Sequence, residues 1–209
     1  MNGLVLVALI FAAAVVMVPF VIHRAYRAPR IRERGTPTDL DLPYRAVSIP
    51  TVNGKRLFAW LVPPISGVEK APAVAMMHGW GGNAEHMLPF AALFHRVGYG
   101  VLLLDARDHG KSDSDSFSSI PRFAEDLEHG LGWLAQQRCI DPGRLALLGY
   151  YVGVAAALLV ASRRRKPAAV ISVAAFAQPA ELMRWQMVSY HIPYLPIGWL
   201  VLRFIERTI

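Results

Sequence analysis

One short stretch of the sequence predicts a strand, a tight turn and a helix in direct succession. The run Leu145–Leu148 is continuously apolar, Gly149 and Gly153 follow it with three residues between them, and an apolar helical pattern comes next. A short apolar run bounded by glycine predicts a strand that is buried on both faces. The sequence therefore predicts a tight, glycine-flanked turn around Tyr151, between a buried strand and a helix.

Other apolar runs of the same kind predict the rest of a parallel sheet. Strands that are apolar on both faces belong to parallel sheets covered by helices. Helical patterns alternate with these runs, and such a β-α-β alternation with right-handed crossovers gives a three-layer α/β sandwich. We expect further strands at Ala73–Met77, Val101–Leu104 and Ala168–Val173, and helices at Glu85–Val97, Pro121–Gln137 and Val152–Ser162.

Two antiparallel strands are predicted ahead of this parallel sheet. The dipeptide Asn53-Gly54 lies between the β-prone runs Tyr44–Pro50 and Arg56–Val62. Asn-Gly between such runs is a strong hairpin signal, because both residues tolerate positive φ. The sheet should therefore be mostly parallel and begin with a hairpin.

The first residues have the composition of a membrane anchor. Residues 3–22 carry no charged side chain. As a helix they would be long enough to cross a hydrocarbon core of about 30 Å. A cleaved signal peptide is the alternative, but Met1-Asn2 has no basic charge, the apolar stretch exceeds a typical signal-peptide core, and no small-residue cleavage site follows. We therefore expect an N-terminal transmembrane anchor over residues 1–23.

A basic collar follows the predicted anchor and suggests its orientation. Five arginines lie between positions 24 and 34, and only Glu33 opposes them. Because basic residues favour the cytoplasmic side, we expect a single-pass membrane protein with its C-terminal domain in the cytoplasm. The collar should also attract anionic lipid headgroups, so the lipid bilayer is the expected partner. We interpret residues 24–43 as a basic juxtamembrane segment and linker, 44–178 as the α/β core and 179–209 as a cap or lid segment.

The net charge does not indicate nucleic-acid binding. The chain carries +7, but the collar and the basic run at 163–166 account for the excess and leave the rest nearly neutral. The run ends an apolar helix, where cations are favoured by the helix dipole. No cluster of His, Cys or carboxylate residues has the spacing of metal ligands, so we expect neither a metal nor a cofactor.

Two loops follow predicted strands and carry the remaining motifs. The first reads His78-Gly79-Trp80-Gly81-Gly82-Asn83, and the second, after Val101–Leu104, reads Asp105-Ala106-Arg107-Asp108-His109-Gly110-Lys111-Ser112. Glycine-rich turns at the carboxyl ends of parallel strands expose backbone amides where ligands bind. With Gly149-Tyr150-Tyr151-Val152-Gly153 between strand and helix, these segments resemble those of the α/β-hydrolase family, in its serine esterase and serine aminopeptidase-like branch.

The resemblance implies roles for individual residues. Tyr151 stands at the position of the family's nucleophilic serine, where the resemblance implies that the two glycines let strand and helix crowd together and that a strained turn points the side chain out of the sheet. The backbone amides of Trp80 and Val152 would form the oxyanion hole. Supporting positions are His78, Gly79, Gly149, Gly153, Asp105, Arg107 and His109. The second loop of the family shapes the floor of the site, so we do not expect Asp105, His109 and Ser112 to form a local triad, because residues this close on one loop rarely converge.

We expect the rest of the family's triad to be absent from this chain. In the family, an acid and then a histidine follow the nucleophile on later loops. Beyond Gly153 the only such residues are Glu181, His191 and Glu206, all in the segment interpreted as a cap. We therefore expect the α/β-hydrolase sheet to be incomplete at its C-terminus.

The expected function follows from these replacements. The resemblance implies ancestral hydrolysis of an ester, thioester or amide through an acyl-enzyme, acting on a small acyl substrate. A phenol ionises near roughly pH 10 and is a poor nucleophile without a base beside it, so we expect no turnover by this chain. Two interpretations stay open: a serine hydrolase altered at position 151 and cut at position 209, and a noncatalytic relative that binds a ligand or a partner.

Overall fold

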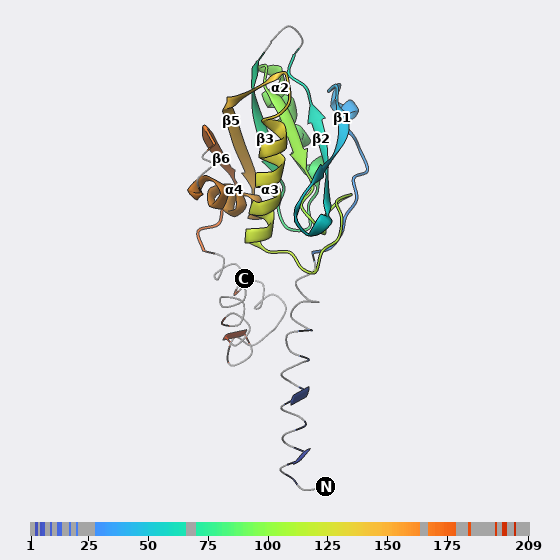
Figure 1. Ribbon diagram of the computed structural model, residues 1–209, viewed down its shortest axis with the longest axis vertical. Coiled ribbons are helices and arrows are strands. Elements are labelled where there is room, and N and C mark those ends of the chain that lie inside the picture. The colour runs from blue at the N-terminus through green and yellow to red at the C-terminus, as the bar shows by residue number, and fades with distance from the viewer. Residues whose placement is uncertain are drawn as a thin grey trace.

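The computed structural model describes residues 28–65, 70–163 and 167–178, together with scattered single positions in the two terminal segments (Figure 1). The predicted membrane anchor and the predicted cap both lie outside these continuous ranges. Within the described residues, no helix combines the length and the apolar character that a membrane crossing requires.

A six-stranded sheet forms the centre of the described chain, in the order β1-β2-β4-β3-β5-β6 (Figure 1). β1 pairs with β2 and β2 with β4 in antiparallel fashion, whereas the β4–β3, β3–β5 and β5–β6 pairs are parallel. The predicted hairpin and the mostly parallel sheet are thus confirmed. The strands are β1 (Arg45–Pro50), β2 (Arg56–Val62), β3 (Ala71–Met77), β4 (Gly100–Leu104), β5 (Ile140–Tyr150) and β6 (Ala169–Val173).

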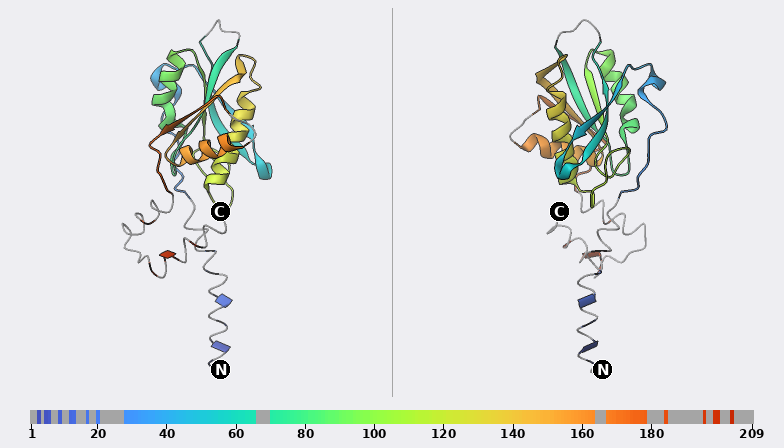
Figure 2. Two further views of the ribbon diagram at one scale, coloured as in Figure 1. Left: turned by 90° about the vertical axis from the view of Figure 1, so that its left-hand side faces the viewer. Right: turned by 45° about the vertical axis from the view of Figure 1, so that its right-hand side comes forward.

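Helices cover the two faces of this sheet and make three layers. Figure 2 shows α2 (Leu88–Arg96) on one face and α3 (Ile120–Leu134) with α4 (Val152–Ser162) on the other. The side chains of β4 alternate between the faces: Val101 and Leu103 join the core beneath α2, and Leu102 and Leu104 join the core beneath α3 and α4. The apolar runs of β3, β4 and the second half of β5 therefore bury both sides of their strands, as predicted, whereas β6 at the edge of the described sheet is only partly buried.

The elements match their predicted ranges closely, with differences at the ends. The predicted helix Glu85–Val97 is a 3₁₀ turn at Ala84–Met87 followed by α2, and α3 ends at Leu134 rather than Gln137. The predicted strand at Leu145 already begins at Ile140.

The early start of β5 results from an irregularity in its pairing with β3. Ala71 pairs with Ile140 and Ala73 with Leu145, so two residues along β3 correspond to five along β5. The Asp141-Pro142-Gly143 segment fills this bulge, and the Gly143 amide donates to Asp141 Oδ1 at 2.9 Å. This tripeptide has the residue types of a tight turn, and it lies inside the strand because pairing with β3 resumes on both sides of it.

The turn from β5 into α4 passes so close to the end of β3 that only glycine fits. A Cβ atom on Gly153 would lie 2.2 Å from the carbonyl oxygen of Met77, and one on Gly149 would lie 2.2 Å from the carbonyl oxygen of Gly153. Both neighbours are backbone atoms and cannot rotate away. The glycine spacing recognised in the sequence is thus a packing requirement.

We predict that Gly153→Ala lowers the free energy of unfolding by about 3 kcal/mol, because the new methyl group forces the helix away from the sheet. Urea denaturation would measure this loss. Gly143→Ala is the matched control, since its Cβ would approach only the Asp141 side chain, at 3.3 Å. Equal stabilities of the two variants would contradict the packing argument.

Candidate functional site

Tyr151 occupies the strained tip between β5 and α4. Its backbone has φ 54° and ψ −113°, an unusual conformation for a residue with a side chain. The Tyr151 amide donates to the carbonyl oxygen of Val173 at 3.0 Å, and the Tyr151 carbonyl accepts from the Val154 amide at 3.0 Å. Its half-buried ring packs edge-on against Phe176, with 5.4 Å between the centroids. The predicted strained turn is therefore confirmed.

The glycine-rich loop after β3 lies directly against this tip. A Cβ atom on Gly79 would lie 3.1 Å from Tyr151 Cβ and 3.4 Å from the carbonyl oxygen of Tyr150. Trp80 follows on this loop, and Val152 opens α4 immediately after the tip. The structure thus brings together the two segments that carry the predicted oxyanion donors. The amino end of a helix favours developing negative charge nearby.

The Trp80 ring turns toward the loop after β4. It stacks on Phe123, with 6.5 Å between the centroids and 13° between the planes, and meets His109 edge-on at 6.0 Å. Phe123 lies on α3 and also contacts the rings of His78 and His109. The sequence motifs did not reveal Phe123, because its role depends on where α3 packs.

His78 is a buried, neutral connector between the two loops. Its Nε2 accepts a hydrogen bond from the Ala106 amide at 3.1 Å, so the proton is on Nδ1, which donates to the Gly79 carbonyl at 2.7 Å. Burial, reinforced by nearby His109, lowers the pKa of His78 to about 3. Both ring nitrogens are therefore engaged, and His78 holds loops together.

His109 and Ser112 form bonds that exclude a local triad. His109 Nδ1 lies 2.9 Å from the Arg107 carbonyl, and the Ser112 hydroxyl donates to the Asp105 carbonyl at 2.7 Å. The Asp105 carboxyl instead accepts the amides of Ala84 and Lys111, at 2.7 and 2.8 Å. The three residues do not converge, as predicted. Burial lowers the pKa of His109, which favours its neutral form.

Arg107 anchors the loop after β4 to α3. Its buried guanidinium pairs with Asp126 at 2.7 Å, with Asp115 at 3.1 Å and with Glu125. Burial opposes this charge, but the three carboxylates outweigh it and raise the pKa of Arg107. Asp126 also accepts the Arg107 amide at 2.8 Å. Arg107 is therefore part of the structural support of the site.

No acid–histidine pair accompanies Tyr151 within the described residues. Glu181, His191 and Glu206, the later candidates from the sequence, lie outside them. Among the described residues, no group of three or more His, Cys, Asp or Glu side chains could hold a metal ion.

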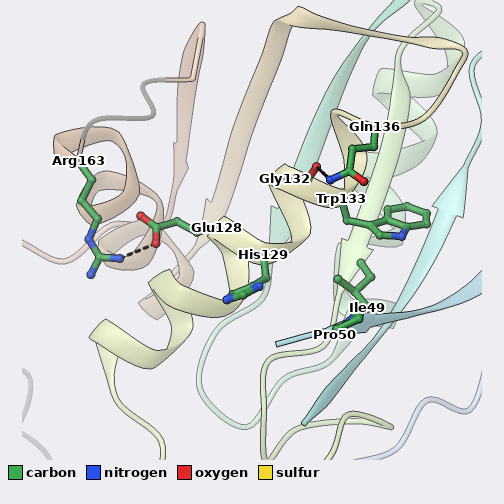
Figure 3. Close-up of a pocket in the computed structure, with 8 residues that line it drawn as sticks. All are labelled: Ile49, Pro50, Glu128, His129, Gly132, Trp133, Gln136 and Arg163. Carbon is green, nitrogen blue, oxygen red and sulfur yellow. Dashed lines mark hydrogen bonds and ion pairs between the residues drawn. The ribbon is translucent and has the colours of Figure 1, made fainter. Parts of the chain in front are cut away.

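A groove of about 750 Å³ lies on the α3 face, apart from this site (Figure 3). An ion pair between Glu128 and Arg163, 2.8 Å long, borders it. Its lining offers no serine, threonine, cysteine or lysine nucleophile and includes none of the predicted site residues. The groove is formed by Ile49, Pro50, Glu128, His129, Gly132, Trp133, Gln136 and Arg163.

The strand order, the strained strand–helix tip and the adjoining glycine-rich loop define an α/β-hydrolase fold. The family profile described as "Serine aminopeptidase, S33" matches residues 69–207. The chain belongs to this family.

Relatives of known sequence and structure agree with this assignment. An uncharacterized protein of Mycobacterium tuberculosis is 33% identical over 158 residues, which cover 76% of this chain and 53% of that protein. A polyketide transferase of Aspergillus fumigatus is 32% identical over 63% of this chain and 45% of its own length. An esterase of Pyrococcus furiosus superimposes with a TM-score of 0.68 and 26% identity, covering 83% of this chain and 63% of the esterase. The chain thus spans about half the length of these curated relatives.

The buried neutral state of His78 predicts a specific pH dependence of stability. The unfolded chain takes up a proton near pH 6.5 and the folded chain only near pH 3, so the stabilising contribution is complete above pH 6.5 and is lost as the pH falls. Between pH 6.5 and 4.5, the free energy of unfolding of the wild type should fall by about 2 kcal/mol in total more than that of His78→Gln. Chemical denaturation at each pH would measure the difference.

The exposed His129 provides the control for this experiment. His129→Gln should follow the wild type across the same pH range. If His78→Gln and the wild type show the same pH dependence, the histidine is not held neutral in the fold.

Proposed function

We propose that this chain is a membrane-anchored member of the serine hydrolase family. Its site would accept a carboxylic ester, thioester or amide. The observation that carries the proposal is the strained Tyr151 tip, which faces the Gly79 loop and is followed at once by the amino end of α4. That arrangement suits the negative oxygen of a tetrahedral acyl intermediate, with donors from Trp80 and Val152.

The names of several relatives support acyl chemistry. They include a thiohydrolase of Aspergillus aculeatus, 32% identical over 62% of this chain, and an sn-1-specific diacylglycerol lipase of mouse, 31% identical over 48%. Together with the esterase of Pyrococcus furiosus, these names refer to ester and thioester substrates. An acyl group is the part that such substrates share.

We further propose that the chain does not turn over such substrates, because Tyr151 takes the place of the nucleophilic serine. A phenol at this position is bulkier than the hydroxyl of an activated serine, and no acid–histidine pair accompanies it within residues 28–65, 70–163 and 167–178. The packing of the Tyr151 ring against Phe176 also fills space beside the tip. Because this packing leaves less room for an acyl substrate, it favours a second candidate function, a noncatalytic protein that binds a ligand or a partner.

The membrane location is part of the proposal and rests on the sequence. Residues 3–22 would span the bilayer once, and the arginine collar would keep the domain on the cytoplasmic side. Residues 179–209 would serve as a cap over the site.

Hydrolysis of p-nitrophenyl butyrate tests the proposed lack of turnover. We expect the wild type to release p-nitrophenol no faster than Tyr151→Phe, which keeps the ring and removes the hydroxyl. A faster wild type would mean that the phenol oxygen acts in the reaction, and would overturn the assignment.

Binding of n-butylboronic acid tests whether the acyl site itself is intact. In Tyr151→Ser, the serine oxygen can add to boron as its proton leaves to solvent, and the tetrahedral boronate would occupy the oxyanion site. We expect Tyr151→Ser to bind about 10-fold more tightly than Tyr151→Ala, equivalent to about 1.4 kcal/mol. Isothermal titration calorimetry would measure both affinities, and equal affinities would count against the proposed oxyanion site.

A further inference from the structure

Residues 28–36, here called the strap, lie across both loops of the candidate site. A Cβ atom on Gly81 would lie 2.9 Å from Pro29 Cγ, so the strap touches the loop after β3. The Asn83 side-chain amide donates to the Ile31 carbonyl at 3.0 Å, and the Arg34 amide donates to Glu85 Oε2 at 2.8 Å. This part of the segment that we interpret from the sequence as a basic collar and linker thus packs against the α/β core.

The loop after β4 also contacts the strap. The Arg30 guanidinium donates to the Ser114 hydroxyl at 3.1 Å. Lys111 Nζ lies 3.3 Å from Glu33 Oε2. The strap therefore joins two loops that approach the site from different strands.

Glu33 is the most deeply placed charged side chain of the strap. Its carboxylate is fully buried, although its neighbours in sequence are arginines. The carboxyl groups of Glu33 and Asp105 both lie against Gly110. A Cβ atom on this glycine would lie 2.0 Å from Asp105 Oδ2 and 2.5 Å from Glu33 Oε1. Two carboxyl groups this close and this buried are stable only when they share a proton.

Asp105 connects this carboxyl pair to the site. Its two oxygens accept the amide of Ala84, which follows the His78–Asn83 loop, and the amide of Lys111. The position of Asp105 therefore fixes the end of one loop and the middle of the other. A change at Glu33 can therefore alter the candidate oxyanion loop through the side chain of Asp105.

We propose that the strap holds the candidate oxyanion loop in its ligand-binding conformation, and that Glu33 is the positioning residue that fastens the strap to Asp105. The proposal rests on the proposed function insofar as the His78–Asn83 loop is taken to bind an acyl oxygen. It adds a regulatory element: release of the strap would loosen that loop.

The charges around the pair predict how docking responds to pH. Burial and the proximity of Glu33 raise the pKa of Asp105 to about 8, and Asp105 and Lys111 help to hold that of Glu33 low despite its burial. The docked strap therefore keeps a proton that a released strap would lose. Through Asp105, docking weakens as the pH rises toward 8 and is weakest above it. Because the pKa of Glu33 is lowered, docking also weakens as the pH falls below 4.5, so it is strongest at mildly acidic pH. The other ionisable groups against the strap are Glu85, which accepts the Arg34 amide, Asp39, which accepts the Thr36 amide, and His109, which is close enough to Arg30 for the two charges to interact. The strap itself carries Arg30, Arg32 and Arg34.

Hydrogen exchange followed by mass spectrometry tests the proposal on the full chain at pH 6.5 and pH 9, after correction for intrinsic exchange rates. In the wild type, the amides of residues 79–84 should exchange at least about 10-fold faster at pH 9 than at pH 6.5. A 10-fold change corresponds to a decrease of about 1.4 kcal/mol in the free energy of local opening. Glu33→Ala should exchange fast at both pH values. Glu33→Gln should stay protected at both, because its amide can donate to an ionised Asp105.

Glu128→Gln is the matched control, since Glu128 pairs with Arg163 on α3 away from the strap. It should behave as the wild type does. Protection of residues 79–84 that does not change with pH in the wild type, or that is unchanged in Glu33→Ala, would overturn the proposal. A Glu33→Gln variant that exchanges as fast as Glu33→Ala would also overturn it. In that case a side chain of the same shape, able to hydrogen-bond Asp105, would not be enough to hold the strap in place.

The exchange measurement separates this proposal from the proposed function, because it requires no ligand. Loss of protection in Glu33→Ala combined with equal boronate affinities in the two Tyr151 variants would support the strap and reject the acyl site. The reverse result would keep the acyl site and reject the strap.

Discussion

The candidate site depends on a single close contact between backbones, where the turn from β5 into α4 passes the carboxyl end of β3. Gly149 and Gly153 permit this contact, because any side chain there would meet carbonyl atoms. The contact sets the direction of α4, places Tyr151 at a strained tip and brings that tip against Gly79. The loop, the tip and the helix end are therefore positioned together by one constraint on size.

The support beneath this contact is polar, but most of it is not charged. His78 is neutral and bridges two backbone groups, and Asp105 accepts two amides while its pKa is raised. Arg107 is the exception, because three carboxylates surround it and outweigh the cost of its burial. Uncharged polar groups suit this position, since they satisfy loop amides without the cost of burying an ion.

Local sequence patterns predicted the frame of the fold well, and they failed where distant segments meet. The Asn53-Gly54 dipeptide, the apolar runs and the glycine pair each act over a few residues, so the hairpin, the parallel strands and the strained tip could be predicted. The buried position of Glu33 could not be predicted. A glutamate among arginines has the pattern of a solvent-exposed basic segment, and its burial depends on contacts with the loop after β4, far along the chain. The bulge in β5 was missed for a related reason: Asp141-Pro142-Gly143 has turn chemistry, and only pairing with Ala71 places it within a strand.

The backbone hydrogen bond of Tyr151 links the tip to the outermost strand of the described sheet. Its amide donates to Val173, the last residue of β6, at 3.0 Å. β6 pairs with β5 along one side and is only partly buried. A shift of β6 along β5 would therefore pull on the hydrogen bond between Val173 and the Tyr151 amide. Such a shift would change the orientation of the Tyr151 side chain.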